Sequence, residues 1–348
     1  MNGKSRILVF GNYDGTNIGD DCILLHVLNE FEKDANDIII PSRRSVYIAE
    51  KYHVNSIQFC SFKFVSEFFK SNVFLIGGGG IFSRYIGPCA KFLPLFAMFA
   101  KLFGKKVIYY KVGVYNTAPF LVKELVKLSM LCSDEISVRD SVSFYTLGFV
   151  SRLKNVTITL DPGLALKPVD KSVAKRLLLY EKFVGEKILV GLSLKYTIDK
   201  EMNSKIVSEF SKFIDWIIEK FDAEVAFFPF SFNTKRTVEN DLEIAKEIQK
   251  VLKSKNMMRF KVIQASNYTP NEIKGMVGLV DLFIGMRFHS ILFAYSMKKP
   301  LIGVSYEEKC RDFLESKRLP FIDVEHVEFS AIKQLFLSKI MKDKKIEE

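Results

Sequence analysis

The sequence contains little cysteine, and its cysteines are not spaced as metal ligands or as disulfide partners. Of its 348 residues only five are cysteine, an odd number, and only one is tryptophan. The absence of a CxxC pair argues against both a zinc site and a disulfide framework. Because cysteines of this kind are typical of a reducing compartment, we predict a cytoplasmic protein.

Long hydrophobic runs are also missing. The longest, Phe92–Phe103, is interrupted by Lys101 and is shorter than the roughly 20 residues that a bilayer requires. The first six residues, Met1 to Arg6, lead directly into a strand pattern and lack the apolar core of a signal peptide. We therefore expect a soluble protein without a secretory leader.

The charge is strongly positive, but it is not arranged as in nucleic-acid binding proteins. The formal net charge of +11 favours an anionic partner, such as a phosphorylated substrate, a membrane surface or a nucleic acid, although it could also serve solubility alone. The sequence has no arginine-rich arm, zinc-finger spacing or RNP-type aromatic motif, so we do not expect nucleic-acid binding.

The chain alternates apolar runs with helical patterns, as α/β proteins with parallel sheets do. Most strand candidates are continuously apolar, which is typical of strands buried on both faces. The predicted strands are Arg6–Gly11, Asp37–Pro41, Ser56–Cys60, Val73–Gly77, Lys106–Val112, Glu135–Val138, Val156–Leu160, Lys187–Ser193, Glu224–Phe228, Phe260–Ile263, Leu282–Phe288 and Pro300–Val304. The predicted helices include Asp21–Lys33, Phe62–Lys70, Pro88–Phe103, Ala118–Leu131, Ser141–Leu147, Lys171–Phe183, Lys200–Phe221, Val238–Leu252, Pro270–Val277, Ser290–Met297 and Glu308–Ser316.

Proline and glycine mark a boundary in the middle of the chain. Asp161-Pro162-Gly163 and then Lys167-Pro168 interrupt the α/β rhythm, which resumes afterwards. We predict an N-terminal domain of residues 1–165 and a second domain of residues 166–325. A C-terminal helix and charged tail, residues 326–348, would follow. Two similar halves imply a cleft between them.

Ligands of such sheets bind beyond the carboxyl ends of the strands, so the loops there are informative. The loop from Gly11 to Asp21 has three glycines, and Asp20 is placed to cap the next helix. Its spacing is neither GxGxxG nor a P-loop, which leaves a dinucleotide site unsupported. The run Gly77–Gly80 after the fourth strand indicates close approach of a ligand or of another backbone, the alternative being a flexible turn.

Two arginines also stand where a predicted strand passes into a helix. Arg139 lies in Ser137-Val138-Arg139-Asp140-Ser141, and Arg287 lies in Gly285-Met286-Arg287-Phe288-His289-Ser290. In an extended segment Arg287 and His289 would project together while Phe288 packs inward. The helix that follows would direct its free N–H groups to the same place, which suits a carboxylate or phosphate. A buried strut and a helix cap are the structural alternatives.

Several motifs, in their order along the chain, resemble those of the polysaccharide pyruvyl transferase family. They are Gly15-Thr16-Asn17-Ile18-Gly19-Asp20, the run Gly77–Gly80, Ile136–Ser143 around Arg139, Asp161-Pro162-Gly163-Leu164, Gly285–Ser290 and Pro300–Lys309. The resemblance extends from about Arg6 to Leu314. It implies two Rossmann-like α/β domains facing across a cleft, the GT-B-like architecture. Because the glycine loops of the N-terminal domain would face the cleft, we expect the acceptor there and the donor on the C-terminal side.

The resemblance also implies an activity and its residues. The reaction is transfer of the pyruvyl group of phosphoenolpyruvate to a sugar of a cell-surface polysaccharide, forming a ketal and releasing phosphate. His289 would be catalytic, as acid or as base. The donor would be bound by Arg287, Arg139, Ser290 and Lys309. Our predictions for acceptor contact are Asn17, Asp20, Gly78, Gly79 and Gly80.

We expect no metal ion and no cofactor, with phosphoenolpyruvate as the donor substrate. The acidic residues near the predicted site, Asp281, Glu307 and Glu308, lack metal-ligand spacing with a histidine. A lipid-linked acceptor is compatible with the segment Cys89–Lys106, whose phenylalanines, leucines and lysines could rest on the inner face of an anionic membrane. An apolar helix in an α/β domain is, however, more often simply part of the core.

Two other functions remain open from the residues. One is a GT-B glycosyltransferase with a nucleotide-sugar donor, which would release a nucleoside diphosphate. The other is a non-catalytic module that binds polyanions at the cell envelope.

Overall fold

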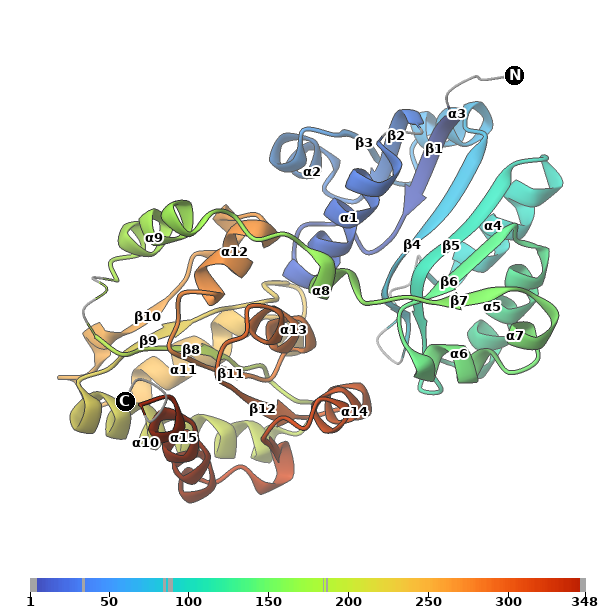
Figure 1. Ribbon diagram of the computed structural model, residues 1–348. Coiled ribbons are helices and arrows are strands. Elements are labelled where there is room, and N and C mark those ends of the chain that lie inside the picture. Colours follow the sequence, from blue (N-terminus) through green and yellow to red (C-terminus); the bar gives the residue numbers. More distant parts are fainter. Residues whose placement is uncertain are drawn as a thin grey trace. The chain divides into compact units, whose positions relative to one another are not determined.

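The computed structural model describes residues 5–32, 35–83, 86, 90–183, 185 and 187–344. The predicted helix start at Pro88, Cys89 and the last residues of the charged tail lie outside these residues. The chain forms two compact units. Unit 1 comprises residues 1–15 and 19–166, and unit 2 comprises residues 16–18 and 167–348. Each unit has one parallel sheet with helices on its faces (Figure 1).

Unit 1 contains a sheet of seven parallel strands in the order β3-β2-β1-β4-β5-β6-β7. Helices α1 and α2 cover one face, and α3, α4 and α5 cover the other, each layer with its own apolar core. The strands are β1 Ser5–Phe10, β2 Ala35–Ser42, β3 Asn55–Gln58, β4 Val73–Phe82, β5 Lys106–Val114, β6 Glu135–Val138 and β7 Val156–Ile158. The helices are α1 Ile18–Phe31, α2 Ser45–Tyr52, α3 Phe62–Lys70, the 3-10 turn η1 Ala90–Phe92, α4 Leu93–Leu102, α5 Phe120–Cys132, α6 Ser141–Leu147, α7 Val150–Leu153 and α8 Pro162–Ala165.

Unit 2 contains a sheet of six parallel strands in the order β10-β9-β8-β11-β12-β13. The strands are β8 Leu189–Ser193, β9 Glu224–Phe227, β10 Phe260–Val262, β11 Leu282–Gly285, β12 Leu301–Ser305 and β13 Phe321–Asp323. The helices are α9 Lys171–Tyr180, α10 Lys200–Phe221, α11 Asp241–Val251, α12 Pro270–Val277, α13 Phe288–Ser296, α14 Glu308–Ser316 and α15 Phe329–Lys344. Short 3-10 turns are η2 Thr237–Glu239, η3 Met257–Arg259, η4 Ala265–Asn267 and η5 Val324–His326.

Both sheets have the strand order of a Rossmann fold, which confirms the predicted α/β class with two Rossmann-like sheets. In each unit the first strand lies beside the fourth, β1 beside β4 and β8 beside β11. The chain continues from the first strand toward one edge of the sheet and from the fourth strand toward the other edge. The loops that follow these two strands therefore diverge. The carboxyl ends of this strand pair are where open α/β sheets bind ligands.

The glycine run does not follow the fourth strand, as predicted, but forms part of it. β4 continues to Phe82, with Gly77 paired to Tyr110 and Gly79 to Val112 of β5. Glycine has a low intrinsic preference for strands, so the local pattern indicated an end. Pairing along β5 overrides that preference.

The segment around Arg287 also differs from its prediction. β11 ends at Gly285 and α13 begins at Phe288, with Arg287 in extended backbone just before the helix. Phe288 and His289 are therefore the first two helical residues, and the predicted alternation of an extended strand across 287–289 is wrong. Helix α2 and strand β13 were not predicted.

The C-terminal helix belongs to the core of unit 2. Ile332 and Phe336 of α15 are fully buried, and Phe336 packs edge to face against Phe213 of α10. The helix thus covers one face of the second sheet, and its burial stabilises unit 2.

Candidate functional site

Charged side chains gather at the carboxyl edge of the sheet in unit 2. Lys195 follows β8, Arg287 follows β11, and Glu307 follows β12. Helices α13 and α14 begin at this edge, so the free N–H groups of their first turns lie there as well. These strands are neighbours in the sheet, with β8 and β11 forming the central pair. The topology therefore unites residues that are far apart in the sequence.

Arg287 is held by a buried carboxylate. Its Nε lies 3.1 Å from both carboxylate oxygens of Asp241, and its Nη2 donates to Asp241 Oδ1 at 2.5 Å. Asp241 is fully buried and also accepts the backbone N–H groups of Phe230 and Ser231, each at 3.0 Å. Burial alone would lower the pKa of Arg287, but Asp241 outweighs it and the pKa is raised. Arg287 is thus a fixed cation with a defined direction.

Lys195 is the most strongly perturbed cation of the site. The residue is 4% exposed, and its Nζ lies 4.2 Å from the ring centre of Tyr306. Burial, followed by repulsion from Arg287, lowers the pKa of Lys195 to about 7. The carboxylates of Glu307 and Asp241 oppose this shift only in part. Lys195 can therefore gain or lose a proton near neutral pH, which an ordinary lysine does not do.

Glu307 and Lys309 form an ion pair at the start of α14. Lys309 Nζ lies 2.9 Å from Glu307 Oε1 and 5.5 Å from the ring centre of Phe288. Burial raises the pKa of Glu307, but the Lys309 ammonium and hydrogen bonds from Tyr306 and Lys309 outweigh it, so the pKa lies below its usual value. Glu307 is therefore a carboxylate at neutral pH. It partly balances the three cations.

His289 and Ser290 lie in the first turn of α13. His289 is half-buried, and its ring contacts Phe288 edge to face, with 5.9 Å between the ring centres. Ser290 is fully buried and its hydroxyl donates to the Arg287 carbonyl at 2.7 Å. Unit 2 therefore brings together four of the predicted site residues: Arg287, His289, Ser290 and Lys309. Their roles in binding and catalysis stay predictions.

Arg139 occupies the carboxyl edge of the other sheet, in unit 1. Its Nη2 donates to the Tyr115 hydroxyl at 2.6 Å, and its Nη1 lies 3.4 Å from Asp161 Oδ2. Tyr115 in turn donates to Asp140 at 2.8 Å. The side chain of Arg139 is only 2% exposed. The guanidinium therefore organises a buried polar cluster, and its predicted donor contact stays a prediction.

The glycines of β4 are required by protein atoms that surround them. A Cβ on Gly78 would lie 2.4 Å from the Lys111 carbonyl oxygen of β5, and one on Gly80 would lie 3.2 Å from Arg139 Nη2. Gly79 has φ +92° and lies against Asp20. Of the two sequence interpretations, close approach of another backbone is thus realised at Gly78.

The other two predicted acceptor residues lie in different units. Asp20 does not cap α1, as predicted, because the helix already begins at Ile18. Its carboxylate instead accepts the side-chain amide of Asn12 at 2.7 Å. Asn17 belongs to unit 2, where it forms an antiparallel bridge with Ser231. Acceptor contact by either residue stays a prediction.

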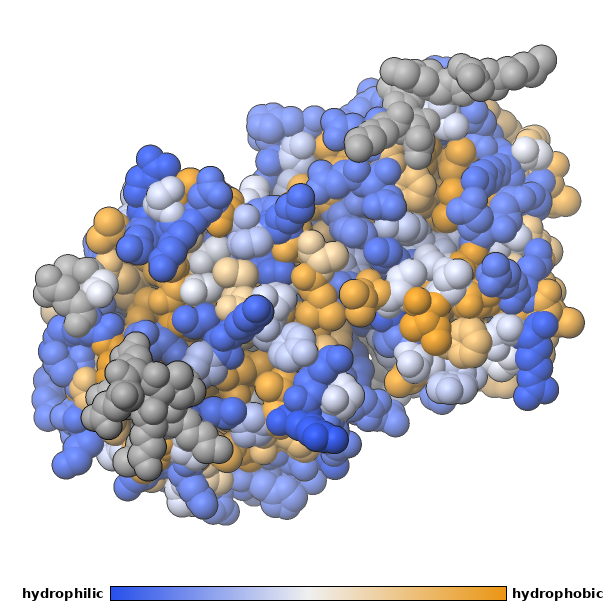
Figure 2. Space-filling model, viewed as in Figure 1, coloured by the Kyte–Doolittle hydropathy of each residue, from blue (hydrophilic) through white to orange (hydrophobic). Residues whose placement is uncertain are grey.

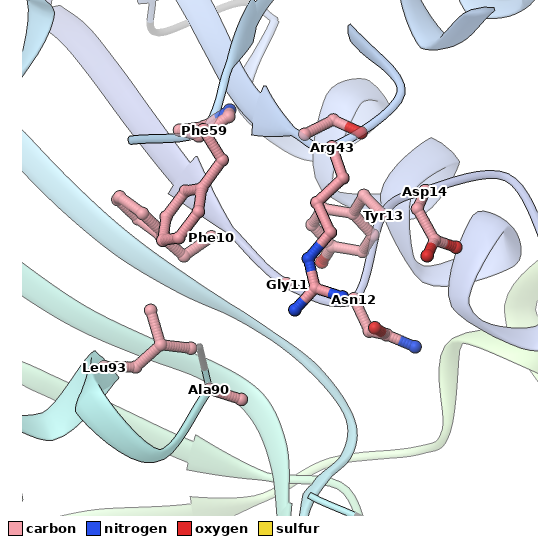
Figure 3. A pocket seen from close by; sticks show the side chains of 11 residues that line it. Phe10, Gly11, Asn12, Tyr13, Asp14, Arg43, Phe59, Ala90 and Leu93 are labelled. Atoms are coloured by element: carbon pink, nitrogen blue, oxygen red, sulfur yellow. The ribbon is translucent and has the colours of Figure 1, made fainter. Parts of the chain in front are cut away.

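Unit 1 has a pocket at the carboxyl ends of β1 and β2, with an empty volume of about 560 Å³. Phe10, Phe59 and Leu93 form an apolar side, and the side chain of Arg43 extends past Tyr13 toward Asn12 on the other (Figure 3). An apolar wall opposite amide, carboxylate and guanidinium groups suits a polar molecule with an apolar face. The remaining lining residues are Gly11, Asp14, Pro41, Ser42 and Ala90.

A metal-binding cluster and a membrane-spanning helix are both absent from the described residues. No group of three or more His, Cys, Asp or Glu side chains in that part of the chain is placed to hold a metal ion. Among the described helices, none combines the length and the apolar character that crossing a bilayer requires.

The two sheets, with basic side chains at the carboxyl ends of their strands, define a two-domain α/β protein suited to anionic ligands. Residues 17–308 match the family model of polysaccharide pyruvyl transferase. The chain belongs to this family, as its motifs predicted. No curated protein sequence gives a significant match.

Solved structures with a similar fold include two UDP-GlcNAc 2-epimerases and a heptosyltransferase. The UDP-GlcNAc 2-epimerase of Methanocaldococcus jannaschii has a TM-score of 0.65 at 13% identity, covering 95% of this chain and 91% of that one. The epimerase of Neisseria meningitidis, bound to UDP-GlcNAc, has a TM-score of 0.64 at 13% identity, covering 97% and 92%. ADP-heptose heptosyltransferase II of Escherichia coli has a TM-score of 0.55 at 10% identity, covering 98% and 99%. These similarities concern the fold alone.

Sequence reasoning missed Lys195. The rule that singled out Arg139 and Arg287, a basic residue directly beyond an apolar strand, also applies to Lys195 two residues after β8. What the sequence did not contain was the strand order that makes β8 the neighbour of β11.

Proposed function

We propose that this protein transfers the pyruvyl group of phosphoenolpyruvate to a sugar of a cell-surface polysaccharide or of its lipid-linked precursor. The product is a pyruvate ketal, and phosphate is released. Two findings support the proposal: membership of the pyruvyl transferase family, and the cluster of Lys195, Arg287 and Lys309 beside His289 in unit 2. The cluster is the observation on which the proposal depends.

The donor carries a carboxylate and a phosphate, which match the cations of unit 2. Arg287, directed by Asp241, offers a planar group that binds carboxylate or phosphate through paired hydrogen bonds. Lys195 and Lys309 add charge, and the first turns of α13 and α14 add N–H donors. Each charge-assisted hydrogen bond contributes about 1.5–3 kcal/mol. Arg139 remains the predicted donor residue of unit 1.

The proposed reaction uses two hydroxyl groups of one sugar. The methylene carbon of phosphoenolpyruvate gains one proton and becomes a methyl group, while two new bonds form between C2 and the sugar oxygens. The bond between C2 and the phosphate oxygen breaks, and the second hydroxyl proton leaves with phosphate. We assign one of these proton transfers to His289, because imidazole is the most frequent general acid or base in enzymes. The lowered pKa of Lys195 makes it a second candidate for proton transfer.

We assign the acceptor to unit 1. Its pocket has phenylalanine rings on one side and Asn12, Asp14 and Arg43 on the other (Figure 3). A sugar ring has an apolar face and a rim of hydroxyl groups, so it matches this division. The predicted acceptor residues Asp20 and Gly78–Gly80 belong to the same unit.

The test is release of inorganic phosphate from phosphoenolpyruvate in the presence of a panel of glycans and lipid-linked glycans. Release should require both substrates. His289→Ala should reduce turnover at least about a hundredfold, the usual contribution of acid–base catalysis, with an unchanged thermal unfolding curve. His326→Ala, at the end of η5 in the same unit, is the matched control. Phosphate release at the wild-type rate by His289→Ala would refute the assigned chemistry.

The same assay separates the alternatives. A glycosyltransferase would release a nucleoside diphosphate from a nucleotide sugar and leave phosphoenolpyruvate intact. A polyanion-binding module would release neither product, and Arg287→Lys would weaken its binding only modestly.

A further inference from the structure

The outer side of three helices in unit 1 is apolar where an α/β protein usually carries polar residues. Helices α3, α4 and α5 cover one face of the sheet. Among their outward residues Phe62 is 97% exposed, Leu102 84%, Phe120 75% and Leu121 70%. Phe69 and Phe92 are also more than half exposed. We refer to these six residues and their exposed apolar neighbours on the same helices as the phenylalanine face.

The exposed residues follow helical periodicity, so they form stripes rather than isolated contacts with solvent. On α3 they are Phe62, Val65 and Phe69, and from η1 through α4 they are Phe92, Leu95, Phe99 and Leu102. Steps of three and four residues place each series on one side of its helix. The opposite sides pack on the sheet through residues such as Phe68 and Ala97. The helices are therefore apolar on both sides.

Aromatic contacts join the stripes into one surface. Phe68 and Phe99 stack with 5.7 Å between ring centres, and Phe69 and Phe103 meet edge to face at 5.3 Å. Helix α4 also packs along α5. Apolar residues reach the surface of unit 1 in the space-filling view, at the edge where Figure 1 labels α4 and α5 (Figure 2). A contiguous apolar surface of this kind is characteristic of an interaction site.

The charges on these helices are mainly positive. Together α3, η1, α4 and α5 contain six lysines and two glutamates. Three of the lysines pair with acidic groups: Lys70 with Glu67, Lys101 with Asp134 and Lys127 with Glu124. Lys63, Lys91 and the half-buried Lys123 form no ion pair with the residues that the structure describes. Exposed phenylalanine and leucine flanked by lysine is the composition of surfaces that rest on anionic bilayers.

We propose that the phenylalanine face docks the protein on an anionic lipid bilayer. The apolar rings enter the boundary between headgroups and acyl chains, and the lysines lie among the headgroups. A protein partner would satisfy the apolar residues equally well, but it would not account for the surplus of lysine. The bilayer explains both observations.

The position of the face relative to the acceptor pocket supports this occupant. Helices that follow parallel strands begin at the carboxyl edge of the sheet, and Phe62, Phe92 and Phe120 stand at the starts of α3, α4 and α5. The pocket residues Phe59 and Leu93 are close to Phe62 and Phe92 in the chain. A sugar carried on a membrane lipid would thus reach the pocket from the bilayer, a conclusion that rests on the proposed function.

The test is sedimentation of the full-length protein with vesicles of phosphatidylcholine, with and without 25% phosphatidylglycerol. We expect binding to the anionic vesicles and weak binding to the neutral ones. Phe62→Ser/Leu102→Ser/Leu121→Ser should reduce the partition coefficient at least about tenfold, because binding scales with buried apolar area. The matched control Leu179→Ser/Met258→Ser removes exposed apolar residues of unit 2, 59% and 84% exposed, and should bind like the wild type. Lys63→Glu/Lys91→Glu should abolish the preference for anionic lipid.

Three outcomes would overturn the proposal: no binding to either vesicle, equal loss in the control variant, or a lipid-free dimer that the triple variant converts to monomer. The last result, read by light scattering, would assign the face to a second copy of the chain. Phosphate release with a soluble glycan tests the proposed function separately. A triple variant that keeps this activity but loses vesicle binding supports docking, whereas an inactive wild type that still binds vesicles refutes only the function.

Discussion

Replacing Lys195 by methionine should stabilise the protein, although it removes a charged residue from the middle of an anion site. The unbranched apolar side chain of methionine resembles the methylene stem of lysine in length and leaves the contact with Tyr306 largely intact. Burial and the nearby Arg287 lower the pKa of Lys195 from 10.5 to about 7. At about 1.4 kcal/mol per pKa unit, the charged form is destabilised by on the order of 5 kcal/mol relative to the unfolded chain.

The sign of the pH dependence follows from the direction of this shift. Between pH 7 and 10.5 the unfolded chain binds the lysine proton and the folded protein does not, so the stability of the wild type rises with pH across this window. The variant lacks this contribution. Its advantage in free energy of unfolding should be largest below pH 7 and should vanish toward pH 10. Urea unfolding at several pH values measures it.

Donor binding gives a second, independent readout. At pH 8 about nine-tenths of Lys195 is neutral in the free protein. A bound trianion raises the pKa of Lys195, so binding should take up close to one proton. Calorimetry in buffers of different ionisation enthalpy detects this uptake, and Lys195→Met should abolish it. Equal proton uptake by both proteins, or a variant less stable than the wild type at pH 6, would refute the reasoning.

Three further predictions concern buried groups outside the reacting atoms. Asp241→Asn leaves the charge of Arg287 without its carboxylate and should cost about 3–5 kcal/mol in urea unfolding, whereas Glu243→Gln, from an exposed pair with Lys246, should cost less than about 1 kcal/mol. Burial raises the pKa of Asp21 from 3.8 to about 7. Between pH 3.8 and 7 the carboxyl group of Asp21 is therefore protonated in the folded protein and ionised in the unfolded chain, and the free energy of unfolding falls as pH rises through this range. Asp21→Asn should remove this pH dependence, and its free energy of unfolding should exceed that of the wild type by up to about 4 kcal/mol at pH 7. The same pH dependence of stability in both proteins would contradict this prediction. Gly78→Ala places a methyl group against the Lys111 carbonyl and should lower the free energy of unfolding by about 1–3 kcal/mol or more. In the control Gly104→Ala the new methyl group has nothing within 4 Å and bears only the strain of a positive φ. Equal shifts of the melting temperature in the two variants would contradict the steric argument.

Several helix starts were predictable from the sequence, some of them with a side chain that caps the first turn. Helices α3, α6, α10 and α12 begin as predicted, behind Ser61, Asp140, Asp199 and the Thr269–Glu272 capping box. Helices α9 and α14 also begin as predicted without such a bond, and the capped helix α11 begins three residues after its predicted start. Helix α2 was missed, and the residue before it, Arg44, makes no capping bond. Capping bonds thus account for some of the predictable helix starts, but not for all of them.

The candidate site was less accessible to sequence reasoning because it depends on strand order. Arg287 was identified, but its partner Asp241 lies 46 residues earlier and its neighbour Lys195 follows a different strand. Only the placement of β8 beside β11 unites them. The sequence also could not show which side of α4 is exposed. A helix with apolar residues all round has no hydrophobic periodicity that distinguishes its outer side from its inner side.

The segment Thr16–Ile18 has a practical consequence for dissecting the protein. It belongs to unit 2, where Ile18 donates to the Phe230 carbonyl and Phe232 donates to that of Thr16, each at 2.9 Å. A fragment of unit 2 that starts at residue 167 would lose this segment. Phe230 and Ser231 are the residues whose N–H groups hold Asp241, and through it the arginine. Proteolysis near Gly15 should therefore loosen a guanidinium that is some 270 positions away along the chain.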